Sequence, residues 1–188
     1  MAYHEFFFSG YIFLIWFYSH KLKKYALIGN LTAAFLAVLP FFGILMYFKN
    51  FYQVIFAHAT FLYLLILTRE LIKDLENLKG DLVADYRTIP VMFGERVSKV
   101  IITILTFLTV VPVYLLIDVY DVGYMDSYFY AGMLVIIWFL GLLWKAESQK
   151  EYLKLHNILK FLIVAGVFCI VLIDPSVLVH GRKFLSAI

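Results

Sequence analysis

A row of oxygen-bearing side chains lies between Arg69 and Pro90, in a chain whose residues are 64% hydrophobic. The row recurs every three or four residues and consists of Glu70, Asp74, Asn77, Asp81 and Asp85. On an α-helix, where each residue turns by about 100°, these side chains fall on one face within an arc of about 80°. Neighbours at such spacings lie about 5–6 Å apart, so their oxygens converge and their like charges repel one another.

A converging set of carboxylates needs a compensating cation. Hard oxygen ligands, few in number and near a phosphate, are what Mg²⁺ prefers. The row therefore predicts a magnesium site on Asp74, Asn77 and Asp81. The alternative is a solvated amphipathic helix end, and Gly80 favours that alternative if it ends the helix before Asp81. Glu76 points away from the row and is expected to be solvated.

The elements that must position this row are membrane-spanning helices. Only 15% of residues are charged, 19% are aromatic, and the mean hydropathy is +0.90, far from the soluble average. Several uncharged runs approach the ~20 residues that cross a bilayer as a helix, and two shorter runs flank them. The long runs are 25–48, 50–68, 100–117 and 127–144, and the short ones are 6–19 and 161–173. We expect an all-α polytopic membrane bundle of about six spans, forming a single domain over residues 1–188.

The rest of the composition excludes several classes of site. Cys169 is the only cysteine and lies in the last apolar run, so a disulfide or cysteine metal site is excluded. The five histidines lack ligand spacing. The start, MAYHEFFFSGYIF, has neither a basic region nor a cleavage site, so it is expected to be a span rather than a secretory signal. No nucleic-acid partner is expected.

The basic residues predict an orientation. With six spans, thirteen lysines and arginines fall on one side and three on the other. The positive-inside rule then places the loop that carries the oxygen row in the cytoplasm and both termini outside. The expected location is a bacterial inner (plasma) membrane.

The stretch RELIKDLENLKGD…YRTIPVMFGE closely resembles the second aspartate-rich motif of the UbiA family of intramembrane prenyltransferases. That motif commonly reads R-E-x-x-K-D-x-E-D-x-x-G-D, followed by T-L-P and a glycine. The match runs without a gap from Arg69 to Gly94. A second stretch, YSHKLKKYALIGN, resembles the segment after the family's fourth helix. The resemblance covers essentially the whole chain, as helices four to nine of a nine-helix fold.

The resemblance implies a reaction and roles for individual residues. The family condenses a polyprenyl diphosphate with a membrane-accessible acceptor, often an aromatic ring as in isoprenoid quinone biosynthesis. Asp74 and Asp81 would then be catalytic and, with Asn77, would hold one Mg²⁺ against the diphosphate. The cations that would neutralise the diphosphate oxygens are Lys23, Lys73 and Arg87. Further candidate site residues are Glu70, Asp85 and Tyr18. Metal and cations would stabilise the departing diphosphate, leaving an allylic carbocation inside apolar walls.

Two departures from the family pattern bear on activity. Asn77 replaces the first aspartate of the family's D-x-x-x-D pair and brings no charge, while Asp85 stands where a glycine is expected. The family's other motif, N-D-x-x-D-x-x-x-D, is absent, and its nearest counterpart, from Asp118 to Asp121, falls on the outer side. We therefore expect a truncated form, lacking the first three helices, or a partner that is a separate amino-terminal half.

Three functions remain open from the sequence. The leading one is a Mg²⁺-dependent intramembrane prenyltransferase. The second is a non-catalytic polytopic membrane protein, or a remnant of such an enzyme. The third, a transporter with a carboxylate relay, is weaker because no acidic residue lies deep within a span.

Overall fold

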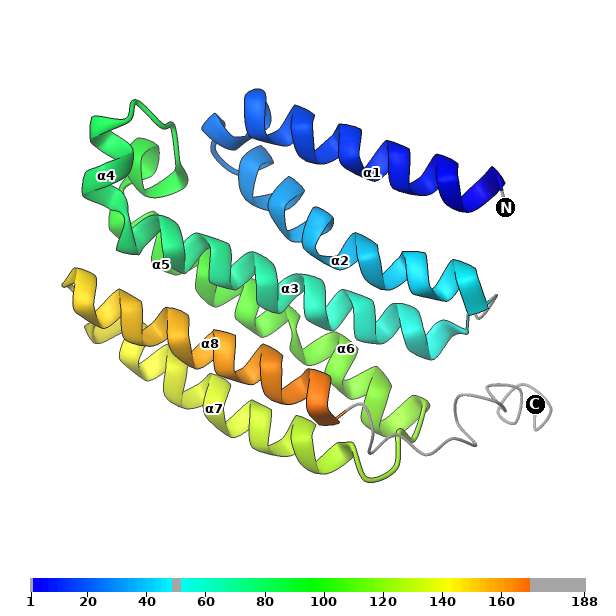
Figure 1. Ribbon diagram of the computed structural model, residues 1–188. Helices are drawn as coiled ribbons and strands as arrows, with labels where there is room; N and C mark the ends of the chain where they lie inside the picture. Colours follow the sequence, from blue (N-terminus) through cyan, green and yellow to red (C-terminus); the bar gives the residue numbers. More distant parts are fainter. Residues whose placement is uncertain (1, 49–51, 170–188) are drawn as a thin grey trace.

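The computed structural model describes residues 2–48 and 52–169, and within them every regular element is helical (Figure 1). The elements in chain order are α1 (Ala2–His20), η1 (Leu22–Lys24), α2 (Ile28–Phe48), α3 (Gln53–Glu76), α4 (Leu78–Val83), α5 (Ile89–Leu108), α6 (Val110–Tyr114), η2 (Leu115–Val119), α7 (Asp126–Lys145) and α8 (Gln149–Cys169). The all-α prediction is confirmed.

Four helical segments are long and apolar enough to cross a membrane by length and composition. They are Gln53–Glu76, Ile89–Val119, Asp126–Lys145 and Gln149–Cys169. Two shorter apolar helices, Phe6–His20 and Ile28–Gly43, precede them. The described part of the chain therefore contains the six apolar helices that the uncharged runs predict, although two are shorter than a full span.

The helix α3 is the central element of the bundle. It packs against α2 on one side and against α5 and α8 on the other (Figure 1). Half of its 24 residues are buried, including Phe61, Leu65 and Leu71. A helix that is apolar around most of its circumference is stable only when other helices surround it. The first four turns of α3, which carry no charge, meet this condition.

Two hydrophobic clusters hold the bundle together along α3. One contains Phe61, Leu116 and Phe129 and joins α3 to η2 and α7. The other contains Leu71, Ile102 and Phe139 and joins α3 to α5 and α7. Because the second cluster packs behind the last two turns of α3, it fixes the end of the helix from which the oxygen row emerges.

The span Ile89–Val119 is interrupted at two places. Gly94 has a φ of 83°, in the left-handed region that favours glycine, so the chain turns within α5 after its first residues. The second interruption lies near Pro112. Helix α5 ends at Leu108, and the short helix α6 that follows leads into the π-helical turn η2. A proline inside a helix removes one backbone hydrogen bond and disturbs the preceding turn, which accounts for this second interruption.

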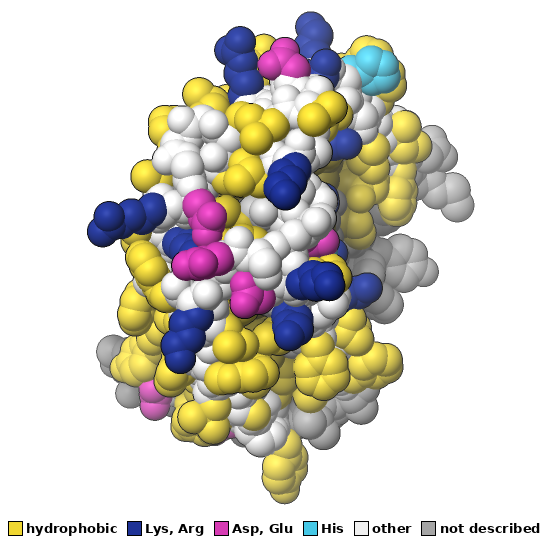
Figure 2. Space-filling view, turned by 90° about the vertical axis from the view of Figure 1, so that its left-hand side faces the viewer, with side chains coloured by type: hydrophobic (Ala, Val, Ile, Leu, Met, Phe, Trp, Pro, Cys, Tyr) yellow, Lys and Arg dark blue, Asp and Glu magenta, His cyan; other side chains and the backbone are white. Residues whose placement is uncertain are grey.

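The basic loops predicted to share a side do lie at one end of the bundle. The α1–α2 connection, α4 and the α7–α8 connection all occur there (Figure 1). The same end carries lysine and arginine side chains around a smaller group of carboxylates (Figure 2). Asp118 lies in η2 and Asp121 in the η2–α7 connection, both at the opposite end, so they are far from the oxygen row.

Candidate metal and diphosphate site

The oxygen row lies on two helices in succession rather than on one. Helix α3 ends at Glu76, and Asn77 is its C-cap with a φ of −97° and a ψ of 10°. The backbone N–H of Asp81 then donates to the Asn77 carbonyl at 2.9 Å, inside α4. Gly80 lies within α4 and does not end the helix before Asp81. The helical face that the spacing predicts is therefore nearly continuous up to Asp81.

Asp74 is anchored by a residue of another helix. Its Oδ2 accepts a hydrogen bond of 2.7 Å from Nδ2 of Asn30, in the first turn of α2. The carboxylate is partly buried at the point where α2 passes α3. Because a primary amide can only donate through this nitrogen, the contact fixes one oxygen of Asp74 and leaves the other available for a cation.

Glu70 has a different environment from the aspartates. Its Oε1 lies 3.1 Å from Nη1 of Arg69, and its Oε2 lies 3.0 Å from Nζ of Lys73. The Glu70 side chain is only 14% exposed. Both of its oxygens are thus engaged by cations of the same helix, so Glu70 orients Arg69 and Lys73 and is not free to face a metal.

Asp81 lies among basic side chains beyond the membrane-spanning part of α3. Burial raises the pKa of its carboxyl above the usual value, while the Thr88 hydroxyl and the charges of Lys73 and Lys23 act in the opposite direction. Asp81 is thus within electrostatic reach of two of the cations that the sequence predicts to bind a diphosphate. The carboxylate and these cations come from three different segments of the chain.

Backbone pairing brings the loop that carries Arg87 next to the connection that carries Lys23. The N–H of Arg87 donates to the carbonyl of Lys24 at 3.1 Å, and Tyr25 and Arg87 form an isolated parallel bridge. Nζ of Lys23 lies 5.6 Å from the centre of the Tyr86 ring, within the range of a cation–π contact. The loop after α1, which carries Lys23, and the loop after α4, which carries Arg87, are therefore joined.

Two other candidates differ in how they face the site. Tyr18, near the end of α1, is half-buried and lies within electrostatic reach of Glu70, Lys73 and Asp74. Asp85 is exposed and has a φ of 53°, a left-handed conformation that ends α4. A glycine adopts that conformation without strain, which explains physically why a glycine suits this position. The Asp85 side chain extends the row in sequence but belongs to the turn.

The donor set fits Mg²⁺ only with help from a substrate. Within the described residues, no three side chains of His, Cys, Asp or Glu gather closely enough to hold a metal ion by themselves. Mg²⁺ is usually held by one or two carboxylates together with substrate phosphates and water. Asp74 and Asp81, with the exposed amide of Asn77 between them, match that pattern.

Two contacts at this end were not predicted from the sequence. The prediction that Glu76 is solvated is wrong, because its Oε2 lies 2.9 Å from Nδ1 of His156 on α8, and both side chains are about 15% exposed. The Asn30–Asp74 hydrogen bond is the other. The partners of Glu76 and Asp74 lie 80 and 44 residues away in the chain, so no local spacing pointed to them.

Comparison with known proteins identifies the family of this arrangement. The model of the UbiA prenyltransferase family matches residues 4–164. The digeranylgeranylglyceryl phosphate synthase of Pyrococcus furiosus is 36% identical over 104 residues, which are 55% of this chain and 37% of that protein. The corresponding synthase of Methanobrevibacter smithii is 27% identical over 169 residues, covering 84% of this chain and 59% of its own length.

A solved structure shares the fold. In a study of digeranylgeranylglyceryl phosphate synthase in membranes, one chain superposes with a TM-score of 0.73 at 23% sequence identity. The match covers 96% of this chain and 62% of that one. The chain thus spans between roughly a third and three fifths of the length of these similar proteins.

Proposed function

Because the chain belongs to the UbiA prenyltransferase family, we propose that it takes part in Mg²⁺-dependent transfer of a polyprenyl group from a polyprenyl diphosphate to an acceptor within the membrane. The observation that carries this proposal is that Lys73 and Lys23 lie within electrostatic reach of Asp81, at the end of α3 that also bears Asp74. Arg87 belongs to the loop that pairs with the connection carrying Lys23. Cations beside carboxylates at a membrane interface suit a metal-bound diphosphate headgroup.

The protein's own residues would act mainly by binding and orienting the diphosphate. Asp74, Asn77 and Asp81 would hold the metal, and the Asn30 amide would keep the Asp74 carboxylate in position. Bound Mg²⁺ supplies positive charge that stabilises the leaving diphosphate. Lys23, Lys73 and Arg87 would neutralise the remaining phosphate oxygens, with Lys73 held by Glu70. Tyr18 would lie beside the carbon from which the diphosphate departs.

The proposed acceptor is an alcohol of a glyceryl phosphate lipid. Support comes from the similar synthases, whose names describe a glyceryl phosphate that bears geranylgeranyl groups. In such a transfer the bond between the allylic carbon and the diphosphate oxygen breaks, and a bond from that carbon to the glycerol oxygen forms. The hydroxyl proton leaves with the diphosphate or to water. An aromatic acceptor, which the family resemblance also allows, has no comparable support.

Pyrophosphate release in membranes tests the proposal. We expect release from geranylgeranyl diphosphate, in the presence of a geranylgeranylglyceryl phosphate acceptor, to require Mg²⁺ and to fall by a factor of 100 or more in Asp74→Asn and in Asp81→Asn. Lys150→Gln, an exposed change on α8 away from the row, is the matched control. The assay is run with the chain alone and with a co-expressed protein that supplies an N-D-x-x-D-x-x-x-D motif.

The outcomes separate the open functions. Release in either arm that depends on both aspartates supports the enzyme. Equal release by wild type and both variants would remove these residues from the mechanism. No release in either arm, with the protein folded in the membrane, would favour the non-catalytic membrane protein.

A further inference from the structure

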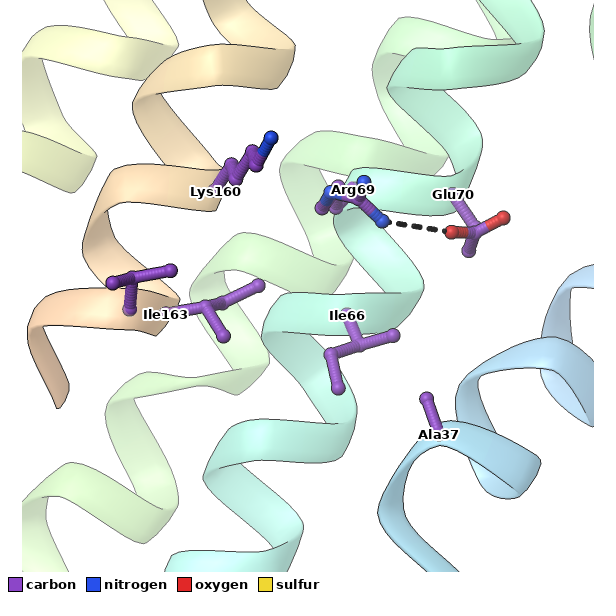
Figure 3. Close-up of a pocket in the computed structure, with 7 residues that line it drawn as sticks. Ala37, Ile66, Arg69, Glu70, Lys160 and Ile163 are labelled. Atoms are coloured by element: carbon purple, nitrogen blue, oxygen red, sulfur yellow. Dashed lines mark hydrogen bonds and ion pairs between the residues drawn. The ribbon is translucent and has the colours of Figure 1, made fainter. Parts of the chain in front are cut away.

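A cavity of about 200 Å³ lies between α2, α3 and α8, on the membrane side of Asp74 (Figure 3). Its lower wall is apolar, and its upper rim carries charged side chains. The apolar residues are Ala37, Ile66 and Ile163, and the charged ones are Arg69, Glu70 and Lys160. An apolar cavity with a few convergent polar groups is the usual form of a small-molecule site in proteins.

The charges at the rim do not balance. Glu70 is the one carboxylate there, and it is shared by Arg69 and Lys73 at 3.1 and 3.0 Å. Lys160 extends from α8 toward Arg69 (Figure 3) and has no carboxylate within 4 Å among the described residues. Two cations of the lining, Arg69 and Lys160, thus face one carboxylate inside membrane-spanning helices, where uncompensated charge is costly. The rim favours a ligand that brings negative charge.

Resting on the prenyl transfer proposed above, we propose that this cavity binds the phosphate headgroup of the lipid acceptor, with Arg69 and Lys160 as its phosphate ligands. The guanidinium of Arg69 offers several donors in a fixed plane, and its ion pair with Glu70 fixes their direction. Lys160 supplies a second charge from the opposite wall. The apolar wall below the rim accommodates the start of the lipid chain.

The position of the rim favours the acceptor over the donor diphosphate. Arg69 precedes Asp74 by five residues of α3, which is about 7.5 Å along the helix axis, and Asp81 lies farther away in the chain, on α4. The donor diphosphate has its own cations around Asp81. A phosphate held at Arg69 and Lys160 leaves the glycerol hydroxyls, a few bonds away, within reach of the reacting carbon near Asp74.

Binding to the purified full chain in detergent tests the proposal. The probes are an alkylglycerol phosphate and the matching alkylglycerol without the phosphate. We expect wild type to bind the phosphate probe more tightly than the uncharged one. In Lys160→Met the affinity for the phosphate probe should fall by about tenfold or more, as for loss of a charge-assisted hydrogen bond. Binding of the uncharged probe should not change. Lys154→Met, which removes an exposed charge on another face of α8, is the matched control. Arg69→Gln should have the same selective effect as Lys160→Met.

A third probe, a non-hydrolysable prenyl thiodiphosphate with Mg²⁺, distinguishes the two sources of phosphate. We expect Lys160→Met to leave its binding unchanged and Asp81→Asn to weaken it. If Lys160→Met weakens the thiodiphosphate and spares the alkylglycerol phosphate, the rim belongs to the donor and the proposal is overturned. Equal binding of both glycerol probes by wild type overturns it as well. Phosphate-selective binding that depends on Lys160, in a protein that releases no pyrophosphate, would support the headgroup site while rejecting prenyl transfer.

Discussion

Asn30 holds Asp74 where α2 passes α3, and this contact is one of several that join the two stretches carrying the family motifs. Asn77 lies at the junction of α3 and α4, where its exposed amide can face a ligand. Since Asn77 brings no charge, the metal affinity of the proposed site would depend on the two aspartates, and therefore on how each of them is held. At the residue scale, the groups that orient the carboxylates matter as much as the carboxylates.

Loss of the Asn30 amide should weaken the metal site. In Asn30→Ala, Asp74 loses a hydrogen bond that is worth about 1.5–3 kcal/mol when the carboxylate is charged. We expect the Mg²⁺ concentration for half-maximal pyrophosphate release to rise by about tenfold. Thr32→Ala on the same helix, which removes only a bond to the Ile28 carbonyl, is the control. An unchanged Mg²⁺ requirement in Asn30→Ala would show that Asp74 needs no such support.

Substitutions of Asp85 test whether this residue matters for the conformation of the turn or for metal binding. Because its φ is 53°, Asp85→Gly should be more stable than Asp85→Ala by about 1 kcal/mol, the cost of a left-handed conformation for a side chain with a Cβ. Unfolding in mixed micelles measures the difference. Both variants should keep the Mg²⁺ requirement of wild type, since the Asp85 carboxylate belongs to the turn. A large rise in that requirement in both variants would make Asp85 a metal ligand.

At the scale of elements, α3 is both the core of the bundle and the carrier of the site. Its two last turns are fixed by the cluster around Leu71 and Phe139, to which α8 contributes Tyr152, Leu155 and Leu159. Beyond α3, Lys99 on α5 donates to the Ala146 carbonyl at 2.6 Å and pairs with Glu95 at 2.9 Å. Tyr152 on α8 also contacts Glu95. These contacts hold α5, α7 and α8 together at the end that bears the site.

The Glu76–His156 pair should contribute to the packing of α3 on α8. A double-mutant cycle with Glu76→Gln and His156→Ala should give a coupling energy of about 1 kcal/mol, because both side chains are largely buried and 2.9 Å apart. Unfolding in mixed micelles measures it. Glu76 with Lys150, an exposed residue of α8, serves as the control pair and should show no coupling. A coupling near zero for Glu76 and His156 would mean that packing alone joins the helices.

At the scale of the whole molecule, the charged end and the opposite end should face different sides of the membrane. In a Cys169→Ala background, we expect Lys79→Cys in α4 to be labelled from the cytoplasmic side. Tyr124→Cys, at an 83% exposed residue of the η2–α7 connection, should be labelled from the other side. An impermeant thiol reagent applied to intact cells, with permeabilised cells as the control, measures both. Labelling of Lys79→Cys in intact cells would mean that the orientation is opposite to the predicted one.

The sequence by itself determined the fold class, the six apolar helices and the helical face that bears Asp74 and Asp81. Those features follow from hydropathy and from spacings of three and four residues, which are local properties of the chain. Only the tertiary structure decided that Asn30 supports Asp74, that Glu76 meets His156, and that Arg69 and Lys160 face one cavity. Each of these pairs joins residues from different helices, and their approach depends on how the helices pack, which no spacing along one helix encodes.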